Sequence, residues 1–156
     1  MKSLVCLAAS AAAIFGADPF AENVRLSDPL TPEEQAKTFT LPPGFKIDLV
    51  AAEPDLFKPM NMAFDAKGRL WVTVSREYPI PAPLDKPARD SIRVLEDFDE
   101  NGRARKITTF ADNLNIPIGL YPYKNGVIAW SIPNLWFFQD TDGDGKADKR
   151  EVLYGP

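Results

Sequence analysis

The sequence contains no histidine, and its single cysteine, Cys6, lies in the first apolar stretch. The lack of histidine excludes a histidine general base, a histidine-ligated zinc site and a histidine-bound haem within these 156 residues. If the first stretch is removed, no cysteine remains for thiol or disulfide chemistry. The net charge is −4 and the sequence has no basic cluster, so no nucleic-acid partner is expected.

Residues 1–17 have the pattern of a secretory signal peptide. Lys2 gives a positive start, residues 4–15 are apolar, and the small residues Gly16 and Ala17 follow. The apolar run is shorter than the roughly 20 residues that a spanning helix needs, so the mature chain is expected to have no membrane span. An uncleaved anchor or a buried helix is the alternative. We therefore expect an exported protein, periplasmic or on a bacterial cell surface.

Residues 18–40 are expected to form a linker that contains a short helix. Thr31 can cap the helix, Pro32 suits its first position, and Glu34 completes a capping box. We expect the helix to run to about Thr38, because Pro42, Pro43 and Gly44 follow soon after.

From residue 45 onward the pattern is that of β-strands. Residues 45–50 alternate apolar and polar side chains. Further strands are expected at residues 61–64, 69–74, 91–96 and 106–110, and again at 118–121, 127–131, 134–139 and 151–154. The turns at Gly68 and Gly126 and two acidic stretches punctuate both sets. The acidic stretches begin at Asp97 and Asp140, 43 residues apart, which is about the length of one propeller blade.

The sequence thus predicts an all-β fold, a partial β-propeller of about two four-stranded antiparallel blades spanning residues 41–156. A meander or sandwich with accidental similarity is the alternative. Two blades cannot close a ring, so we expect the chain to be the N-terminal part of a longer protein. The remaining blades of that protein would be its first partners.

The second acidic loop, from Asp140 to Glu151, has the ligand spacing of a calcium loop. Positions 1, 3, 5, 7, 9 and 12 are expected to supply its oxygen ligands: Asp140, Asp142, Asp144, the Lys146 carbonyl, Asp148 and Glu151. The flanking residues are strand-like rather than helical, which indicates a calcium-type loop inside a β-hairpin. A solvated turn, in which aspartates bond their own backbone, is the alternative.

The first acidic loop is a weaker candidate for the same role. It keeps Asp97, Asp99 and Asn101, followed by Gly102. Positions 9 and 12 hold Arg105 and Thr108, which offer no carboxylate. In either loop the expected task of the ion is structural, holding a hairpin.

A long loop over residues 76–90 is the other candidate site, since long loops on rigid scaffolds often carry function. Its polar residues could line one face of the propeller, and the alternative is a solvated surface loop; they are Arg76, Glu77, Tyr78, Lys86, Arg89 and Asp90. The tryptophans at 71, 130 and 136 are expected in the core or between blades rather than on a sugar-binding surface.

Several motifs together resemble one family. They are Leu41-Pro42-Pro43-Gly44-Phe45, Val50-Ala51-Ala52-Glu53-Pro54, Gly68-Arg69-Leu70-Trp71-Val72, Glu77-Tyr78-Pro79, the acidic loops, Phe110-Ala111-Asp112-Asn113-Leu114 and Arg150-Glu151-Val152-Leu153. This pattern is similar to the membrane-bound dehydrogenase family of planctomycete and verrucomicrobial bacteria, whose N-terminal propeller is of the glucose/sorbosone dehydrogenase type. The resemblance covers about residues 31–156.

The resemblance implies a six-bladed propeller, an exported location and oxidation of a sugar or alcohol with pyrroloquinoline quinone, electrons then passing to a c-type haem. This chain has neither the haem segment nor the family's catalytic histidine, so those parts would lie outside it. Two other readings stay open. One is a non-catalytic propeller module that binds carbohydrate or protein, and the other is a truncated, inactive product.

Overall fold

The computed structural model describes residues 27–83 and 85–156. The chain divides into two units, residues 1–31 and 32–156, and the second contains both sheets. The signal peptide predicted at residues 1–17 and the start of the predicted linker lie outside the described residues. Within the described part, no helix has the length and apolar character needed to cross a membrane.

The only described helix is short and exposed. Helix α1 spans Pro32–Ala36 and carries Glu33 and Glu34 in its first turn, where carboxylates favour the positive end of the helix. A turn follows, in which the Thr38 hydroxyl donates to the Gln35 carbonyl at 2.8 Å. The helix therefore ends slightly before the predicted Thr38.

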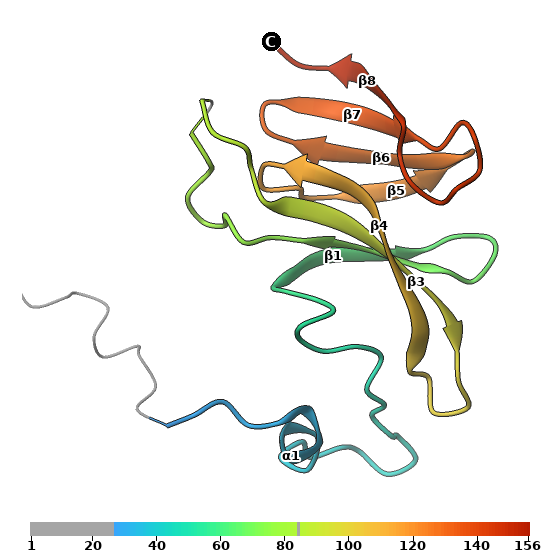
Figure 1. Cartoon of the computed structure of the whole chain (residues 1–156). Coiled ribbons are helices and arrows are strands. Elements are labelled where there is room, and N and C mark those ends of the chain that lie inside the picture. The colour runs from blue at the N-terminus through green and yellow to red at the C-terminus, as the bar shows by residue number, and fades with distance from the viewer. Residues whose placement is uncertain (1–26, 84) are drawn as a thin grey trace, which may run out of the picture. The chain divides into compact units, whose positions relative to one another are not determined.

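Eight strands form two antiparallel sheets of four, each with its strands in chain order (Figure 1). The first sheet contains β1 (Pro59–Phe64), β2 (Leu70–Val74), β3 (Asp90–Phe98) and β4 (Ala104–Leu114). The second contains β5 (Leu120–Tyr123), β6 (Gly126–Ser131), β7 (Asn134–Gln139) and β8 (Lys149–Tyr154). These eight strands confirm the predicted all-β fold of two four-stranded antiparallel units.

The main core lies between the two sheets. Strand alternation turns one face of β2, β3 and β4 toward one face of β6 and β7, and the side chains of both are buried. The Trp71 and Phe110 rings meet edge to face with centroids 4.7 Å apart. The buried residues of this core are Trp71, Ile92, Val94, Phe110, Ala111, Leu114, Val127, Ala129 and Phe138, with Trp136 packed against them. Strands β1 and β5 lie side by side, as the inner strands of neighbouring propeller blades do.

The opposite face of the first sheet is covered by chain that precedes β1. Val50, Ala51 and Leu56 pack against a second buried group, Leu70, Val72, Val74 and Leu95. The strand predicted at residues 45–50 is absent, and this prediction was wrong for the described structure. The segment has no ladder of strand partners, and a β-strand needs one to satisfy its backbone. Only the Val50 carbonyl bonds the first sheet, accepting from the Ala104 N–H at 3.0 Å.

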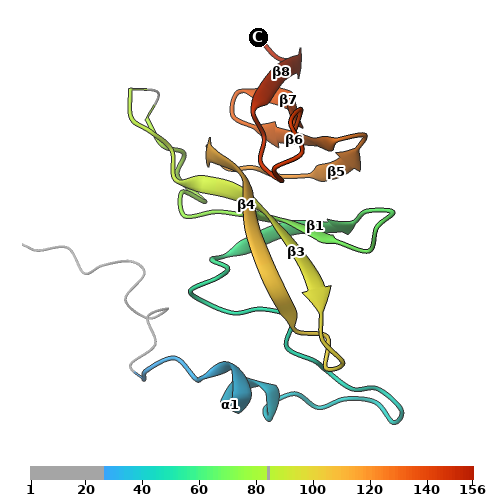
Figure 2. The same cartoon turned by 45° about the vertical axis from the view of Figure 1, so that its right-hand side comes forward.

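The antiparallel order sorts the connections into two sets at opposite ends of the strands. The β2–β3 loop (residues 75–89) and the β4–β5 link (residues 115–119) lie at one end. The turns after β1, β3 and β5 and the Asp140 loop after β7 lie at the other. Strands β3 and β4 are longer than their neighbours and extend beyond them as a hairpin (Figure 2). The two predicted candidate regions, the acidic loops and the long loop, are therefore at opposite ends.

Candidate functional site

The Asp140 loop folds around its first carboxylate. The Gly143 N–H donates to Asp140 Oδ1 at 2.6 Å, and the Gly145 N–H donates to Oδ2 at 2.9 Å. Both glycines have positive φ, 85° and 86°, a region that side chains other than glycine rarely adopt. The two glycines thus let the backbone turn sharply enough to present its N–H groups to one aspartate.

Three of the predicted ligand residues are brought together. One carboxylate oxygen from each of Asp140, Asp142 and Asp148 lies within 4.8 Å of the others. Asp148 is held by Thr141, whose hydroxyl donates to Asp148 Oδ2 at 2.7 Å. This hydrogen bond holds the pKa of the exposed Asp148 carboxyl below its usual value. Converging carboxylate oxygens are the donors that Ca²⁺ prefers.

The other predicted ligands are placed differently. The Asp144 carboxylate accepts from the Lys146 N–H at 2.8 Å and lies outside the gathered group. The Glu151 carboxylate lies along β8, 3.4 Å from Gln139 Nε2 and 3.8 Å from Lys149 Nζ. Of the six predicted positions, the structure therefore gathers the carboxylates of positions 1, 3 and 9.

The first acidic loop is a compact hairpin turn. Asp99 Oδ1 accepts from the N–H groups of Asn101 and Arg103 at 2.9 and 3.0 Å, and Gly102 has a φ of 79°. Asp97 points to Arg105 at 3.8 Å and is largely exposed. Among the described residues no acidic group of three gathers here. The structure therefore does not bring Asp97, Asp99 and Asn101 into a common ligand set.

The same turn occurs between β1 and β2. Asp65 Oδ1 accepts from the N–H groups of Lys67 and Arg69 at 2.9 and 3.0 Å, and Gly68 has a φ of 76°. Both turns have the sequence Asp-x-x-Gly-Arg, at residues 65–69 and 99–103. The pattern shared with residues 65–69 is therefore the sequence signal that could have identified residues 99–103 as a self-contained turn rather than a metal loop.

The Asp140 loop also joins the two sheets. The Ala147 N–H donates to the Phe110 carbonyl on β4 at 2.7 Å. Arg150, at the start of β8, donates to the Asp112 carbonyl at 2.9 Å. On the other side, Asn125 Nδ2 donates to the Asp140 carbonyl at 2.6 Å. The loop is therefore fixed to β4 and to the β5–β6 turn rather than projecting freely.

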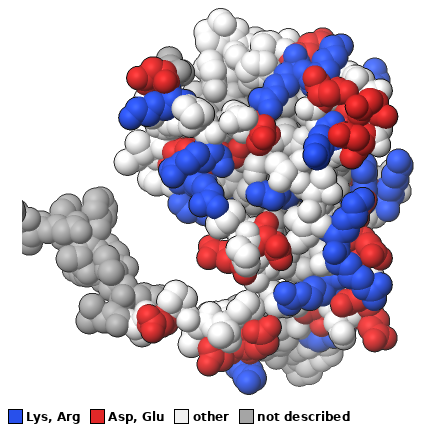
Figure 3. Space-filling view, viewed as in Figure 1, with Lys and Arg blue, Asp and Glu red and all other residues white. Residues whose placement is uncertain are grey.

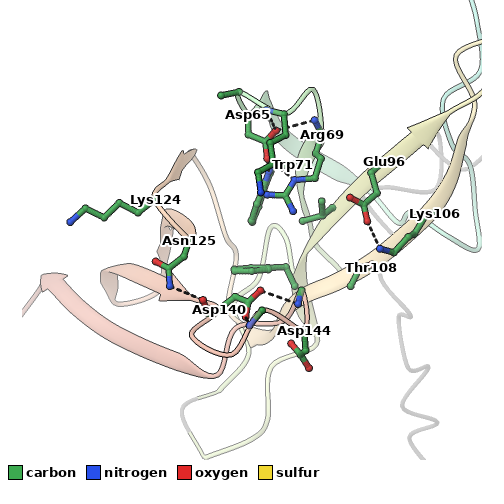
Figure 4. A pocket seen from close by; sticks show the side chains of 16 residues that line it. Asp65, Arg69, Trp71, Glu96, Lys106, Thr108, Lys124, Asn125, Asp140 and Asp144 are labelled. Carbon is green, nitrogen blue, oxygen red and sulfur yellow. Dashed lines mark hydrogen bonds and ion pairs between the residues drawn. The ribbon is translucent and has the colours of Figure 1, made fainter.

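A cleft of about 520 Å³ lies between this loop and the Asp65 turn. Figure 4 shows Asp65, Arg69 and Trp71 on one side and the loop with Asp140 and Asp144 on the other. Its walls carry two ion pairs, with Arg69 Nε 2.7 Å from Asp65 Oδ2 and Lys106 Nζ 2.5 Å from Glu96 Oε1. The other charged lining residues are two lysines and two aspartates: Lys67, Lys124, Asp140 and Asp144. Acidic and basic groups also alternate over the face in Figure 3. The cleft thus has no field of one sign to select a charged ligand.

The Asp65 carboxylate accepts more hydrogen bonds than any other side chain that lines the cleft. Burial alone would raise the pKa of its carboxyl, but hydrogen bonds from the Trp71 indole at 2.9 Å and from Arg69 outweigh burial and lower the pKa. The ionised form is therefore favoured in the folded state.

We expect Asp65→Asn to flatten the acid dependence of stability. A lowered pKa gives stability that is complete above the unfolded value of about 3.9 and is lost as pH falls through the folded value. Asparagine keeps an oxygen for the turn N–H groups but has no such titration. Urea unfolding between about pH 5 and pH 3 measures the difference. Asp99→Asn is the matched control, since Asp99 occupies the same turn without the indole and guanidinium donors. Equal acid sensitivity of wild type and Asp65→Asn would contradict the assignment.

At the other end, Asp90 is the residue that organises the long loop. Its side chain is buried and accepts four hydrogen bonds: from Ser75 Oγ at 2.8 Å and from the N–H groups of Arg76, Glu77 and Ile116 at 2.5, 3.0 and 2.8 Å. Asp90 was one of the residues that could line one face of the propeller or lie in a solvated loop, but it is a buried structural acceptor between the β2–β3 loop and the β4–β5 link.

Asn115 ties the same two segments together, a role that sequence reasoning missed. Its side chain accepts from the Ala82 N–H and donates to the Ala82 carbonyl, both at 3.0 Å. Its own N–H donates to Ser131 Oγ at 2.9 Å. An asparagine directly after a strand gives the same signal in an exposed turn, so the residue types alone do not reveal this contact.

The other predicted residues of the long loop are mostly engaged with neighbours. Arg89 Nε pairs with Glu77 Oε1 at 2.9 Å, and the Arg76 guanidinium lies 3.5 Å from the centre of the Phe57 ring. Lys58 donates to the Tyr78 carbonyl at 2.7 Å, while the Tyr78 side chain stays 47% exposed. Lys86 is exposed. This end is a layer of loops joined by hydrogen bonds through Asp90 and Asn115, with Tyr78 open to solvent.

Comparison with known proteins places the chain in a family. No curated protein and no solved structure matches the chain. A protein-family comparison matches residues 31–155 to a domain of unknown function, DUF7133. This stretch includes α1, all eight strands, both acidic loops and the long loop. Because the match spans well over half of the sequence, the chain belongs to the DUF7133 family.

Proposed function

We propose that this domain forms two blades of an exported, six-bladed β-propeller that oxidises a sugar or alcohol. The proposal rests on one observation: the loops at one end of the sheets, residues 75–89 and 115–119, are fixed to each other. Asp90 and Asn115 lock residues 75–89 to residues 115–119. In a ring of such sheets, these loops would gather around one end of the central axis, where propellers commonly place their sites. The dehydrogenase resemblance of the motifs supplies the reaction class.

Pyrroloquinoline quinone is the cofactor that the resemblance implies, and the residues of this chain do not fit it on their own. The quinone carries several carboxylates, which need free cationic partners. At the loop layer, Arg89 is paired with Glu77, Arg76 is stacked on Phe57 and Lys58 is bonded to Tyr78. Lys86 is the one exposed lysine of residues 75–83 and 85–89, and a single cation does not match several carboxylates. A c-type haem needs a Cys-x-x-Cys-His motif, which this sequence lacks. The cofactor contacts and the catalytic base are therefore assigned to parts of the protein outside these residues.

The oxidation itself is tested on the complete protein. Reconstituted with pyrroloquinoline quinone, it should reduce an artificial electron acceptor when supplied with aldoses or polyols. The alternative is a module that holds carbohydrate without oxidising it, and the exposed Tyr78 ring favours this reading, because open aromatic rings stack on sugars. Binding of sugar without acceptor reduction by the quinone-loaded protein would support the module and overturn the dehydrogenase proposal.

Calcium at the Asp140 loop is the second part of the proposal. The ligand spacing of the sequence and the convergence of Asp140, Asp142 and Asp148 support it. The ion would add a constraint to a loop already fixed to β4 through Ala147. Its task would be structural, because the loop lies at the end of the strands opposite the long loop.

We expect calcium to raise the melting temperature of the protein by about 4 °C, if the site has the weak affinity usual for extracellular modules and is filled about tenfold above Kd. Chelator should reverse the shift, and Asp140→Asn should remove it. Asp97→Asn, at the end of β3 and outside the described carboxylate group, should keep it. Differential scanning calorimetry with titrated CaCl₂ makes the measurement. The same melting temperature with calcium and with chelator would rule out the ion.

A further inference from the structure

Residues 45–50 have strand character but no sheet in the described structure. Phe45 and Ile47 are 72% and 46% exposed, although strand alternation would place them on one apolar side. Lys46 and Asp48 lie on the other side and form an ion pair at 2.8 Å, the arrangement of neighbouring residues on one face of a strand. The proposed activity does not account for this segment.

The segment repeats the sequence of an outer strand. Lys46-Ile47-Asp48-Leu49-Val50-Ala51 matches Lys106-Ile107-Thr108-Thr109-Phe110-Ala111, with lysine, isoleucine and alanine at the same places. The second stretch lies in β4, the outermost strand of the first sheet. In that strand, Ile107 packs against the buried group with Leu70 and Val72. Ile47 is the equivalent residue.

The position along the chain repeats as well. After β4, the chain runs through residues 115–119 into β5, the inner strand of the next sheet. After residues 45–50, the chain runs through residues 51–58 into β1, the inner strand of the first sheet. The turn glycines follow at similar intervals, 22 residues from Lys46 to Gly68 and 20 from Lys106 to Gly126. Residues 45–50 therefore precede the inner strand of the first sheet in the same way as β4 precedes the inner strand of the second sheet.

The first sheet has exposed apolar side chains on the face that points away from the second sheet. Met62 and Phe64 on β1 pair with Val72 and Leu70 on β2, so they share the face of the first sheet that points away from the second. They are 73% and 67% exposed, whereas Val72 and Leu70 are buried under residues 50–56. Large apolar side chains on an inner strand indicate a covered surface.

We propose that residues 45–50 are the outermost strand of a further antiparallel sheet, the last blade of the same ring. Its other three strands would come from the far end of the complete protein. That sheet would cover Met62 and Phe64, as the first sheet covers the second. The inference rests on the proposed propeller and adds how the ring is locked: one chain segment belongs to its last blade and continues directly into its first.

Hydrogen exchange on the complete protein and on the 156-residue chain tests the proposal. In the complete protein, the amides of residues 45–50 should exchange at least roughly 100-fold more slowly than in the 156-residue chain, in the same range as β2. Ile47→Asp should remove this protection and leave that of β2 intact. Lys46→Asp, on the polar side of the same strand, should keep it.

The outcomes separate this inference from the ring itself. If the complete protein forms a ring by electron microscopy but residues 45–50 exchange as fast as in the 156-residue chain, the strand assignment is overturned and the ring stands. If no ring forms, both fail. If the protection of residues 45–50 in the complete protein depends on protein concentration, the strand pairs with a second copy, and the assignment to the same ring is overturned.

Discussion

Asp90→Ala should lower the free energy of unfolding by about 3–5 kcal/mol, because it leaves several buried donors without an acceptor. The Asp90 carboxylate is the common acceptor for the Ser75 hydroxyl and three backbone N–H groups. One of these belongs to Ile116, a β-branched residue with a φ of 48°, a conformation that costs energy unless its surroundings hold it. Loss of the Asp90 carboxylate removes one of the hydrogen bonds that hold Ile116 in this conformation.

Urea unfolding followed by tryptophan fluorescence measures this effect. Asp85→Ala, on the exposed part of the same loop, should change stability by no more than about 0.5 kcal/mol. Asp90→Asn should lie between them, since asparagine keeps the shape and one acceptor oxygen but turns an NH₂ group toward other donors. Trypsin offers a second measure, because a released loop becomes open to cleavage after Arg76 and Arg89. Equal stability of Asp90→Ala and Asp85→Ala would contradict the role given to Asp90.

Gly126→Ala should also be severe, with a loss of roughly 3 kcal/mol or more. A Cβ atom at this glycine would lie 1.9 Å from the Phe138 carbonyl oxygen and 2.9 Å from its carbonyl carbon. These are backbone atoms of the neighbouring strand β7, and Phe138 itself is buried in the core between the sheets. The strands would have to separate to admit one methyl group.

The matched control is Gly68→Ala, at the corresponding turn of the first sheet. Gly68 has a φ of 76° and open space around the position of a Cβ atom, so alanine there should cost only about 1 kcal/mol of backbone strain. Urea unfolding compares the free energies of unfolding of the two variants. Gly126→Ala reports the cost of crowding against β7, and Gly68→Ala reports the cost of backbone strain alone. A smaller loss for Gly126→Ala than for Gly68→Ala would show that β6 and β7 adjust without cost.

The strands could be predicted because their information is local. Alternation and turn glycines such as Gly68 place each strand within a few residues, and burial between two sheets selects which alternate face is apolar. Residues 45–50 show the limit of this reasoning. Their pattern is as regular as that of β4, but a strand exists only where another supplies backbone partners, and no described strand pairs with them.

The candidate sites were less predictable because their contacts join distant residues. Asp90 and Ile116 are separated by 26 positions, and nothing in either residue type indicates that they meet. In the Asp140 loop, the spacing predicts six ligands, but spacing alone does not fix where each carboxylate lies in the folded loop. Asp144 lies outside the gathered group, and Glu151 continues along β8, where strand pairing places it beside Gln139 and Lys149.

The two Asp-x-x-Gly-Arg turns make this end of the first sheet suitable for engineering. Each turn satisfies its own backbone through one aspartate and one glycine, at residues 65–69 and 99–103. The two middle residues of each are exposed, Ala66 and Lys67 in one and Glu100 and Asn101 in the other. Fluorophores or affinity tags grafted at these pairs would sit on rigid supports, at two defined points of one blade, without disturbing its interior.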